Sequence, residues 1–232
     1  MKSSKFSIAA LLVAGVMMVG CSTWSNKGKG AAYGGGGGAL LGAGIGALAG
    51  GGKGAAIGTA IGAAVGTGAG VLIGNKMDKK QAEIEQQVKD AQVQEVTDQN
   101  GLQAIKVTFN DGLLFGFNSS TLSTSAQNAL ANFAKTVASE PDMDITIYGN
   151  TDNVGTRAAN EKVSTARAQA VQNFLLGHGV SPKQIIKVQG LAYDSPVADN
   201  STEAGRAQNR RVDIYLTANQ NMVKQAEAGT LK

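Results

Sequence analysis

Hydrophobic positions in the second half of the chain recur with two periods, one of two residues and one of three to four residues. Alternation predicts β-strands, and recurrence at every third or fourth position predicts amphipathic helices. The expected strands are 102–109, 143–148, 185–188 and 212–216. The expected helices are 123–140, which Pro141 ends, and 157–178, which closes in Gly177-His178-Gly179.

The order of these segments indicates the fold class. Strand, helix, strand, helix, strand predicts an α+β domain with a βαβαβ-type mixed sheet and helices on one face. Between the first strand and the first helix, Asn110-Asp111-Gly112 predicts a turn that leads into residues 113–117. We place this domain at residues 101–218 and treat residues 219–232 as a C-terminal tail.

A polar segment precedes the domain. Residues 76–98 are rich in Lys, Asp, Glu and Gln, and their apolar side chains follow an approximate helical stripe. The members of this stripe are Met77, Ile84, Val88 and Ala91. The pattern predicts an amphipathic linker helix over 76–100, which we expect to be solvated.

Glycine is concentrated further toward the N-terminus, in residues 34–74, which hold 18 of the 32 glycines. Eleven of them follow a strict step of four residues from Gly34 to Gly74. Such a stripe lets apolar helices approach closely in lipid, whereas in water each glycine destabilises a helix by about 1 kcal/mol. We therefore expect residues 34–75 to form a membrane-embedded helical hairpin with a turn at 51–54. A disordered or surface-lying glycine tract is the alternative.

The pattern of residues 1–20 is typical of a bacterial export signal. Lys2 and Lys5 precede 15 uncharged, mainly apolar residues, fewer than the roughly 20 that a spanning helix needs. The run ends at Cys21, the single cysteine, and this arrangement resembles the lipobox of bacterial lipoproteins. The resemblance implies that residues 1–20 are a cleaved signal peptide, that Cys21 carries acyl chains such as palmitate, and that 21–33 tether the anchor to the chain.

Charge and composition exclude several classes of function. The formal net charge is +4, but residues 1–74 contain five lysines and no acid, so the rest of the chain is close to neutral. Nucleic acid is therefore not an expected partner. One cysteine and one histidine in 232 residues leave no basis for a disulfide framework or for a metal site built on His or Cys. We predict no cofactor, no metal and no catalytic residue.

Two polar clusters stand out on the predicted scaffold. Residues 150–155, Asn-Thr-Asp-Asn-Val-Gly, follow a strand, and residues 163–170, Val-Ser-Thr-Ala-Arg-Ala-Gln-Ala, lie on the next helix. Four further stretches complete the set: Phe117-Asn118, Gln189-Gly190, 196–202 and 205–212. Over roughly 104–218 these motifs resemble the OmpA-like peptidoglycan-associated domain. With the lipobox and the glycine repeat, the chain is similar to YiaD-type outer-membrane lipoproteins.

This resemblance implies non-covalent binding of peptidoglycan through the diaminopimelate of its stem peptide, which is a zwitterion. Asp152 would accept the ammonium group, and Arg167 would bind the carboxylate in a bidentate pair. The other implied contacts are Asn118, Thr151, Asn160, Val163 and Arg211. Of Arg210 and Arg211, one is expected to support the site or reach the ligand, and we assign this role to Arg211. The alternative for Asp152 and Arg167 is a structural ion pair with each other.

The function expected from these features is that of a lipid-anchored outer-membrane protein whose C-terminal domain binds the cell wall from the periplasm. Its expected partners are peptidoglycan and the lipid bilayer, with a homo-oligomer as a further expectation of the glycine zipper. One alternative function is a zipper oligomer or pore-like membrane assembly that the wall-binding domain anchors. A wall hydrolase that uses Asp152 as acid or base would need a second carboxylate, a nucleophile or a metal nearby, and we predict that the protein is not an enzyme.

Overall fold

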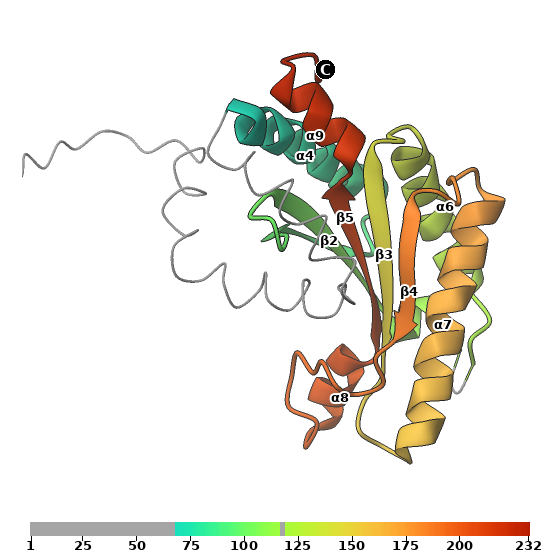
Figure 1. The fold of residues 1–232 in the computed structure, drawn as a ribbon. Helices are drawn as coiled ribbons and strands as arrows, with labels where there is room; N and C mark the ends of the chain where they lie inside the picture. The colour runs from blue at the N-terminus through green and yellow to red at the C-terminus, as the bar shows by residue number, and fades with distance from the viewer. Residues whose placement is uncertain (1–67, 117–118) are drawn as a thin grey trace, which may run out of the picture.

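The computed structural model describes residues 68–116 and 119–232, and within them a five-stranded mixed sheet carries helices on one face (Figure 1). The strands are β1 (Gln92–Thr97), β2 (Gln103–Asn110), β3 (Met143–Asn150), β4 (Ile185–Gly190) and β5 (Arg211–Ala218). The helices are α4 (Gly68–Gln87), α5 (Asp111–Leu114), α6 (Thr124–Ala138), α7 (Arg157–Gly177), α8 (Glu203–Asn209) and α9 (Gln220–Glu227). This architecture confirms the predicted α+β class.

The strand order brings three chain segments together at one end of the sheet. The order is β1-β2-β5-β3-β4, in which β3 and β4 run parallel and every other neighbouring pair runs antiparallel. The last strand, β5, therefore lies between β2 and β3. Its first residue, Arg211, pairs with Asn110 at the end of β2 and with Asn150 at the end of β3. The loops that follow β2 and β3 and the segment that enters β5 meet at this end.

The two faces of the sheet differ in polarity, as the alternating pattern predicts. On one face, Val107 and Phe109 of β2 are fully buried, and the Phe109 ring packs edge-on against Phe133 of α6 with 6.1 Å between centroids. On the opposite face, Lys106 lies 3.2 Å from a carboxylate oxygen of Asp213 in β5. The helices thus cover the apolar face, and polar side chains line the other.

Both long helices begin where the sequence predicts. Ser123 and Thr156 have extended backbone and accept the N–H groups of Ala126 and Ala159, which caps α6 and α7. At its other end α7 is capped by His178, in agreement with the predicted helix end. Between these ends, α7 packs against β3 and β4.

The prediction of a solvated linker helix over 76–100 is wrong in both extent and environment. The helix, α4, ends at Gln87, and residues 92–97 form the edge strand β1. The apolar stripe of α4 is buried in the same core as the sheet and α6, and the side chains of Ile73 and Met77 are completely inaccessible to solvent. The helical spacing was read correctly, but the stripe packs against the domain because the β1–β2 part of the sheet needs a helix to cover its apolar face.

The boundaries at residues 101 and 219 also shift. Residues 219–232 are not a simple tail, because α9 packs against α4 through Met222, Val223 and Ala226. Asn219 caps α9 by accepting two backbone N–H groups. The turn expected at residues 110–112 is the start of the one-turn helix α5, which ends at Leu114 and is followed by an isolated β-bridge between Phe115 and Leu122.

Several predictions concern residues outside the described part of the chain. The signal peptide, Cys21 with its tether, and the glycine repeat up to residue 67 all lie there. The last steps of the repeat, Gly70 and Gly74, fall within α4. Among the helices of residues 68–116 and 119–232, none has a stretch both long and apolar enough to cross a bilayer.

Candidate functional site

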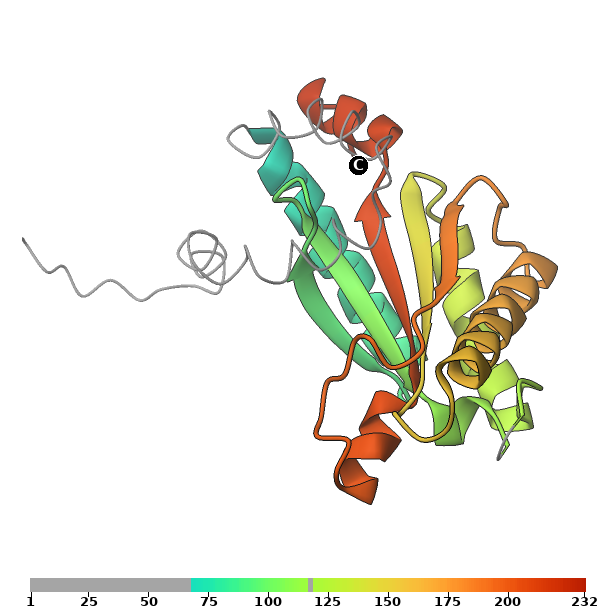
Figure 2. The same ribbon diagram turned by 60° about the horizontal axis from the view of Figure 1, so that its bottom comes forward.

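The predicted site lies at the end of the sheet where β3 ends and β5 begins, and α8 projects beyond this end (Figure 2). Four charged side chains from four chain segments meet there. They are Asp111 at the start of α5, Asp152 after β3, Arg167 on α7, and Arg210 between α8 and β5. We refer to these four residues as the charge quartet.

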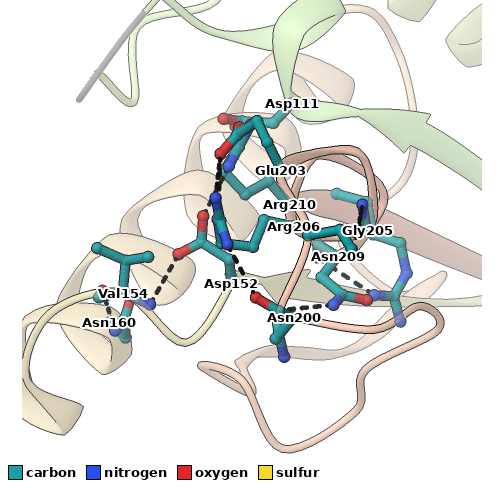
Figure 3. Close-up of polar contacts among 12 residues, drawn as sticks. Asp111, Asp152, Val154, Asn160, Asn200, Glu203, Gly205, Arg206, Asn209 and Arg210 are labelled. Atoms are coloured by element: carbon teal, nitrogen blue, oxygen red, sulfur yellow. Dashed lines mark hydrogen bonds and ion pairs between the residues drawn. The ribbon is translucent and has the colours of Figure 1, made fainter.

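Asp152 is held by two hydrogen bonds within the protein (Figure 3). One carboxylate oxygen accepts the backbone N–H of Val154 at 3.1 Å, and the other lies 2.7 Å from Nη1 of Arg210. Asp152 is 8 % exposed. Arg210 is also bound to Glu203 at 3.0 Å, and both carboxylates raise the pKa of Arg210. A carboxylate has about four lone-pair positions, so Asp152 keeps the capacity to accept further donors.

Arg167 is buried, with 5 % of its surface exposed. Its Nη2 lies 2.9 Å from a carboxylate oxygen of Asp111, and its Nε donates to the carbonyl oxygen of Ser119 at 3.1 Å. The Phe115 ring lies against the guanidinium group, 5.1 Å away. Burial lowers the pKa of Arg167, and Asp111 opposes this shift. The group remains charged in any case, because an arginine does not lose its proton in proteins.

Asp152 and Arg167 do not form the ion pair that the alternative interpretation required. Among the described residues, Asp152 pairs with Arg210, and Arg167 pairs with Asp111. Burial and the neighbouring Arg210 lower the pKa of Arg167, whereas Asp111 and, to a smaller extent, Asp152 raise it. The result is one site with two anions and two cations.

The position of Arg167 depends on close packing of α7 against the sheet. At Gly149 of β3, a Cβ atom would overlap the carbonyl group of Ser164, and at Gly190 of β4 it would overlap Ser164 Oγ and the backbone of Thr165. Ser164 Oγ also accepts the N–H of Ala192 at 3.1 Å. Only glycine lets α7 approach this closely, and Arg167 follows one turn later on the same helix.

Arg210 is positioned by the corner between α8 and β5. Asn209 is fully buried and accepts the N–H groups of Val197 and Ala198 at 2.7 and 3.0 Å. At Gly205 of α8, a Cβ atom would overlap the carbonyl group of Asp199. The loop before α8 is thereby tied to the helix, and Arg210 emerges from this corner toward Asp152 (Figure 3).

Arg211, the arginine assigned to the site from the sequence, contacts residues outside the quartet. Its side chain is buried on the polar face of the sheet, where Nε lies 3.0 Å from Asp213. It also donates to the carbonyl oxygens of Asn209 and Ser195 at 3.2 and 2.9 Å. Arg210 is the one of the two arginines that contacts Asp152. Arg210 precedes β5 with extended backbone and Arg211 is its first residue, so the two side chains point to opposite sides.

Three further predicted residues, Thr151, Asn160 and Val163, lie close in the chain to Asp152 or Arg167 and differ in what they do. Thr151 donates its backbone N–H to Ala192 at 2.8 Å, and its buried hydroxyl has no partner among the described residues. Asn160 donates to the carbonyl oxygens of Val154 and Thr156 at 2.9 and 3.2 Å, so it braces the loop that carries Asp152. Val163 is half-buried one turn before Arg167. Asn118 lies outside the described residues.

Sequence reasoning missed two members of the quartet. Asp111 was interpreted as a turn residue, and Arg210 was set aside in favour of its neighbour. A carboxylate next to a predicted strand end and a pair of arginines before another strand were the available signals. Within the described residues, no group of three or more His, Cys, Asp or Glu side chains has the arrangement of a metal site. The quartet instead suits a small ligand that carries charges of both signs.

Comparison with known proteins finds two family models that match parts of the chain. The fold is that of a small α+β domain with a cluster of charges at one end of its sheet, and residues 114–210 match the OmpA family. Residues 1–78 match the YMGG-like Gly-zipper family. The chain thus has a C-terminal region that matches the OmpA family and an N-terminal region that matches the Gly-zipper family, in agreement with the resemblance predicted from its motifs.

Three curated relatives show the extent of the similarity. The outer-membrane lipoprotein YfiB of Pseudomonas aeruginosa is 38 % identical over 106 residues, which cover 46 % of this chain and 62 % of YfiB. The probable lipoprotein YiaD of Escherichia coli is 36 % identical over 107 residues, 46 % of this chain and 48 % of YiaD. The peptidoglycan-binding protein ArfA of Mycobacterium bovis is 36 % identical over 113 residues, 49 % of this chain and 34 % of ArfA. The match spans less than two thirds of each relative.

Solved structures agree in fold. A putative MotB-like protein from Desulfovibrio vulgaris superposes with a TM-score of 0.54 at 25 % identity and covers 63 % of this chain and 93 % of its own. The cell wall anchor of the type VI secretion system from Pseudomonas aeruginosa superposes with a TM-score of 0.50 at 25 % identity, over 61 % and 96 % of the two chains.

Proposed function

We propose that this protein is a cell-envelope lipoprotein whose OmpA-family domain binds peptidoglycan without covalent attachment. The observation that carries the proposal is the charge quartet. In it the buried Asp152 and Arg167 lie at one end of the sheet, and each is paired with a different residue, Arg210 and Asp111 respectively. A zwitterion such as the diaminopimelate end of a stem peptide would place its ammonium group at Asp152 and its carboxylate at Arg167. The similarity to a protein named for peptidoglycan binding, ArfA, supports this reading.

The domain acts in this proposal as a binding module rather than an enzyme. Each charged group of the quartet has a partner that fixes its direction, which suits recognition of a charged ligand. Charge-assisted hydrogen bonds contribute about 1.5–3 kcal/mol each, so loss of either contact should weaken binding about tenfold or more.

Co-sedimentation with purified peptidoglycan tests the proposal. Asp152→Ala and Arg167→Ala in the full chain should each lose at least about four fifths of the bound fraction at concentrations near the wild-type Kd. Glu227→Ala and Lys135→Ala are matched controls, because both side chains are exposed and lie on helices near the opposite end of the sheet from the quartet. Circular dichroism establishes that all four variants are folded. Full binding by both quartet variants would overturn the assignment of the site.

We further propose that acyl chains on Cys21 anchor the protein in the outer membrane, with the OmpA-family domain in the periplasm. The similarity to the lipoproteins YfiB and YiaD supports this arrangement. Several acyl chains on one residue anchor a protein stably, whereas one chain is marginal. Cys21→Ser should move the protein from the membrane fraction to the soluble fraction. If the variant stays with the membrane, the glycine zipper is itself an anchor. Native mass spectrometry in detergent then tests whether the zipper forms a homo-oligomer.

A further inference from the structure

Asp111 already pairs with the guanidinium group of Arg167, to which the carboxylate of the proposed ligand would bind. The guanidinium group of Arg167 has five N–H donors. Nη2 binds Asp111 at 2.9 Å and Nε binds the carbonyl oxygen of Ser119 at 3.1 Å. Phe115 covers the guanidinium plane. Nη1 has no hydrogen-bond partner among the described residues. A ligand carboxylate that binds Arg167 through Nη1 would therefore share the guanidinium group with Asp111.

The surroundings of Asp111 come from three elements. Its carboxylate faces Arg167 of α7, Arg210 of the corner before β5, and Asp152 of the loop after β3, and Arg210 in turn binds Glu203 of α8. The backbone ties the same residues together, because the N–H of Asp111 donates to the carbonyl oxygen of Arg210 at 3.0 Å. Burial raises the pKa of Asp111, the two arginines lower it, and Asp152 raises it again, with a raised pKa as the result.

We propose that Asp111 stands in for the ligand carboxylate in the free protein, and that binding of a carboxylate to Arg167 is coupled to uptake of one proton from solvent by Asp111. The inference rests on the proposed function. Two carboxylates on one buried guanidinium repel each other, and with Asp152 nearby one of them is best accommodated in its neutral form. A protonated Asp111 is uncharged and leaves the full charge of Arg167 to the ligand. Asp111 is in this sense a specificity-determining residue rather than a ligand contact.

The coupling has a fixed sign. Because the complex binds one more proton than its separate components, affinity rises as the pH falls, by at most about tenfold per pH unit above the pKa of Asp111. Asparagine has nearly the shape of aspartate and can still accept a hydrogen bond from Arg167, but it carries no charge. Asp111→Asn should therefore bind more tightly than the wild type at pH 7.5 and should lose this part of the pH dependence.

Isothermal titration calorimetry tests the proposal with the full chain in detergent micelles and a soluble stem tripeptide that ends in meso-diaminopimelate. Titrations at pH 5.5, 6.5 and 7.5, each in two buffers of different ionisation enthalpy, measure the protons taken up. The expected result is uptake by the wild type at pH 7.5, and for Asp111→Asn no uptake with affinity at least severalfold higher. Glu227→Gln, an acid-to-amide change at an exposed position of α9, should match the wild type.

The outcomes separate the two proposals. Wild-type binding without proton uptake, or weaker binding by Asp111→Asn at every pH, overturns the role of Asp111 and leaves the proposed function standing. Absence of binding by the wild type overturns the proposed function and this inference with it. Thermal unfolding of Asp111→Asn checks its fold, and if the variant is unfolded, the buffer dependence of the wild type alone decides the question.

Discussion

Asp152 and Arg210 form an ion pair across the end of the sheet, with 2.7 Å between Oδ2 and Nη1. Their side chains are 12 % and 30 % exposed, so the pair is neither fully desolvated nor freely solvated. The residues are 58 positions apart in the chain, and the pair therefore links the loop after β3 to the corner before β5. Asp152 is thus oriented in the free protein, before any ligand arrives.

A double-mutant cycle should detect this pair as a modest coupling. We expect the single variants Asp152→Asn and Arg210→Gln and the double variant to give a coupling free energy of about 0.5–1 kcal/mol in urea unfolding, which is typical of partly exposed ion pairs. The coupling should shrink in 1 M salt because the pair is accessible to screening ions. A cycle that closes with no coupling at low salt would mean that the pair does not stabilise the site.

Gly149 of β3 is a residue at which an added Cβ atom would change the geometry of the site. Gly149→Ala would place a Cβ atom on the carbonyl group of Ser164, so α7 must move away from β3 or the backbone must distort. We expect a loss of about 2 kcal/mol or more in the free energy of unfolding, measured by urea denaturation. Because Arg167 lies on α7, peptidoglycan binding should weaken beyond the effect of partial unfolding.

Gly177→Ala is the matched control for this substitution. Gly177 is the last residue of α7, and a Cβ atom there would meet nothing within 4 Å. The alanine should be neutral or should stabilise the helix by up to about 1 kcal/mol. Equal effects of the two substitutions would show that helix propensity, rather than contact with Ser164, accounts for the result.

The position of α4 predicts where the folded unit begins. A fragment of residues 101–232 lacks α4 and β1 and exposes the surface on which Ile73, Met77 and Ile84 are buried. Truncation of one such buried side chain to alanine typically lowers the free energy of unfolding by about 2–5 kcal/mol. The loss of all three is therefore comparable to the total stability of a typical domain. We expect residues 68–232 to unfold in one cooperative thermal transition by circular dichroism and residues 101–232 to show none. A cooperative transition in the shorter fragment would contradict this boundary.

The fold could be predicted wherever periodicity was strong. Residues 143–147 alternate and Leu130, Phe133 and Val137 recur at helical spacing, and both segments adopt the predicted structure. Strand β1 was missed because Gln92–Thr97 is polar apart from two valines and lies at the sheet edge, mostly exposed. Its strand character comes from pairing with β2, and local periodicity does not reveal such a pairing.

The site could be predicted only to the extent that its motifs are local. The sequence points to Asp152 and Arg167, and both lie in the quartet. Their partners Asp111 and Arg210 come from distant segments, and only the insertion of β5 between β2 and β3 brings them together. The choice between Arg210 and Arg211 depended on which way each side chain points at the start of β5, which the sequence alone does not determine.

Asp144 of β3 provides a pH-dependent test of the sheet. It pairs with Thr217 in the β3–β5 register, and burial raises its pKa from 3.8 to about 6. An acid whose pKa is raised by folding binds its proton more tightly in the folded state. Its contribution to stability is therefore fully present below about pH 4 and is lost as the pH rises through about 6.

Asp144→Asn removes this titration. At pH 7.5 the variant should be more stable than the wild type by about 1–2 kcal/mol, after allowance for the partial exposure of the carboxyl group. At pH 4 the difference should nearly vanish, because the wild-type carboxyl group is then protonated in the folded chain and neutral like the amide. Urea unfolding of both proteins at the two pH values measures the difference, with the exposed Asp90→Asn as control. A gain of equal size at both pH values would mean that the amide stabilises the strand through packing or hydrogen bonding and that Asp144 is not destabilised by its charge.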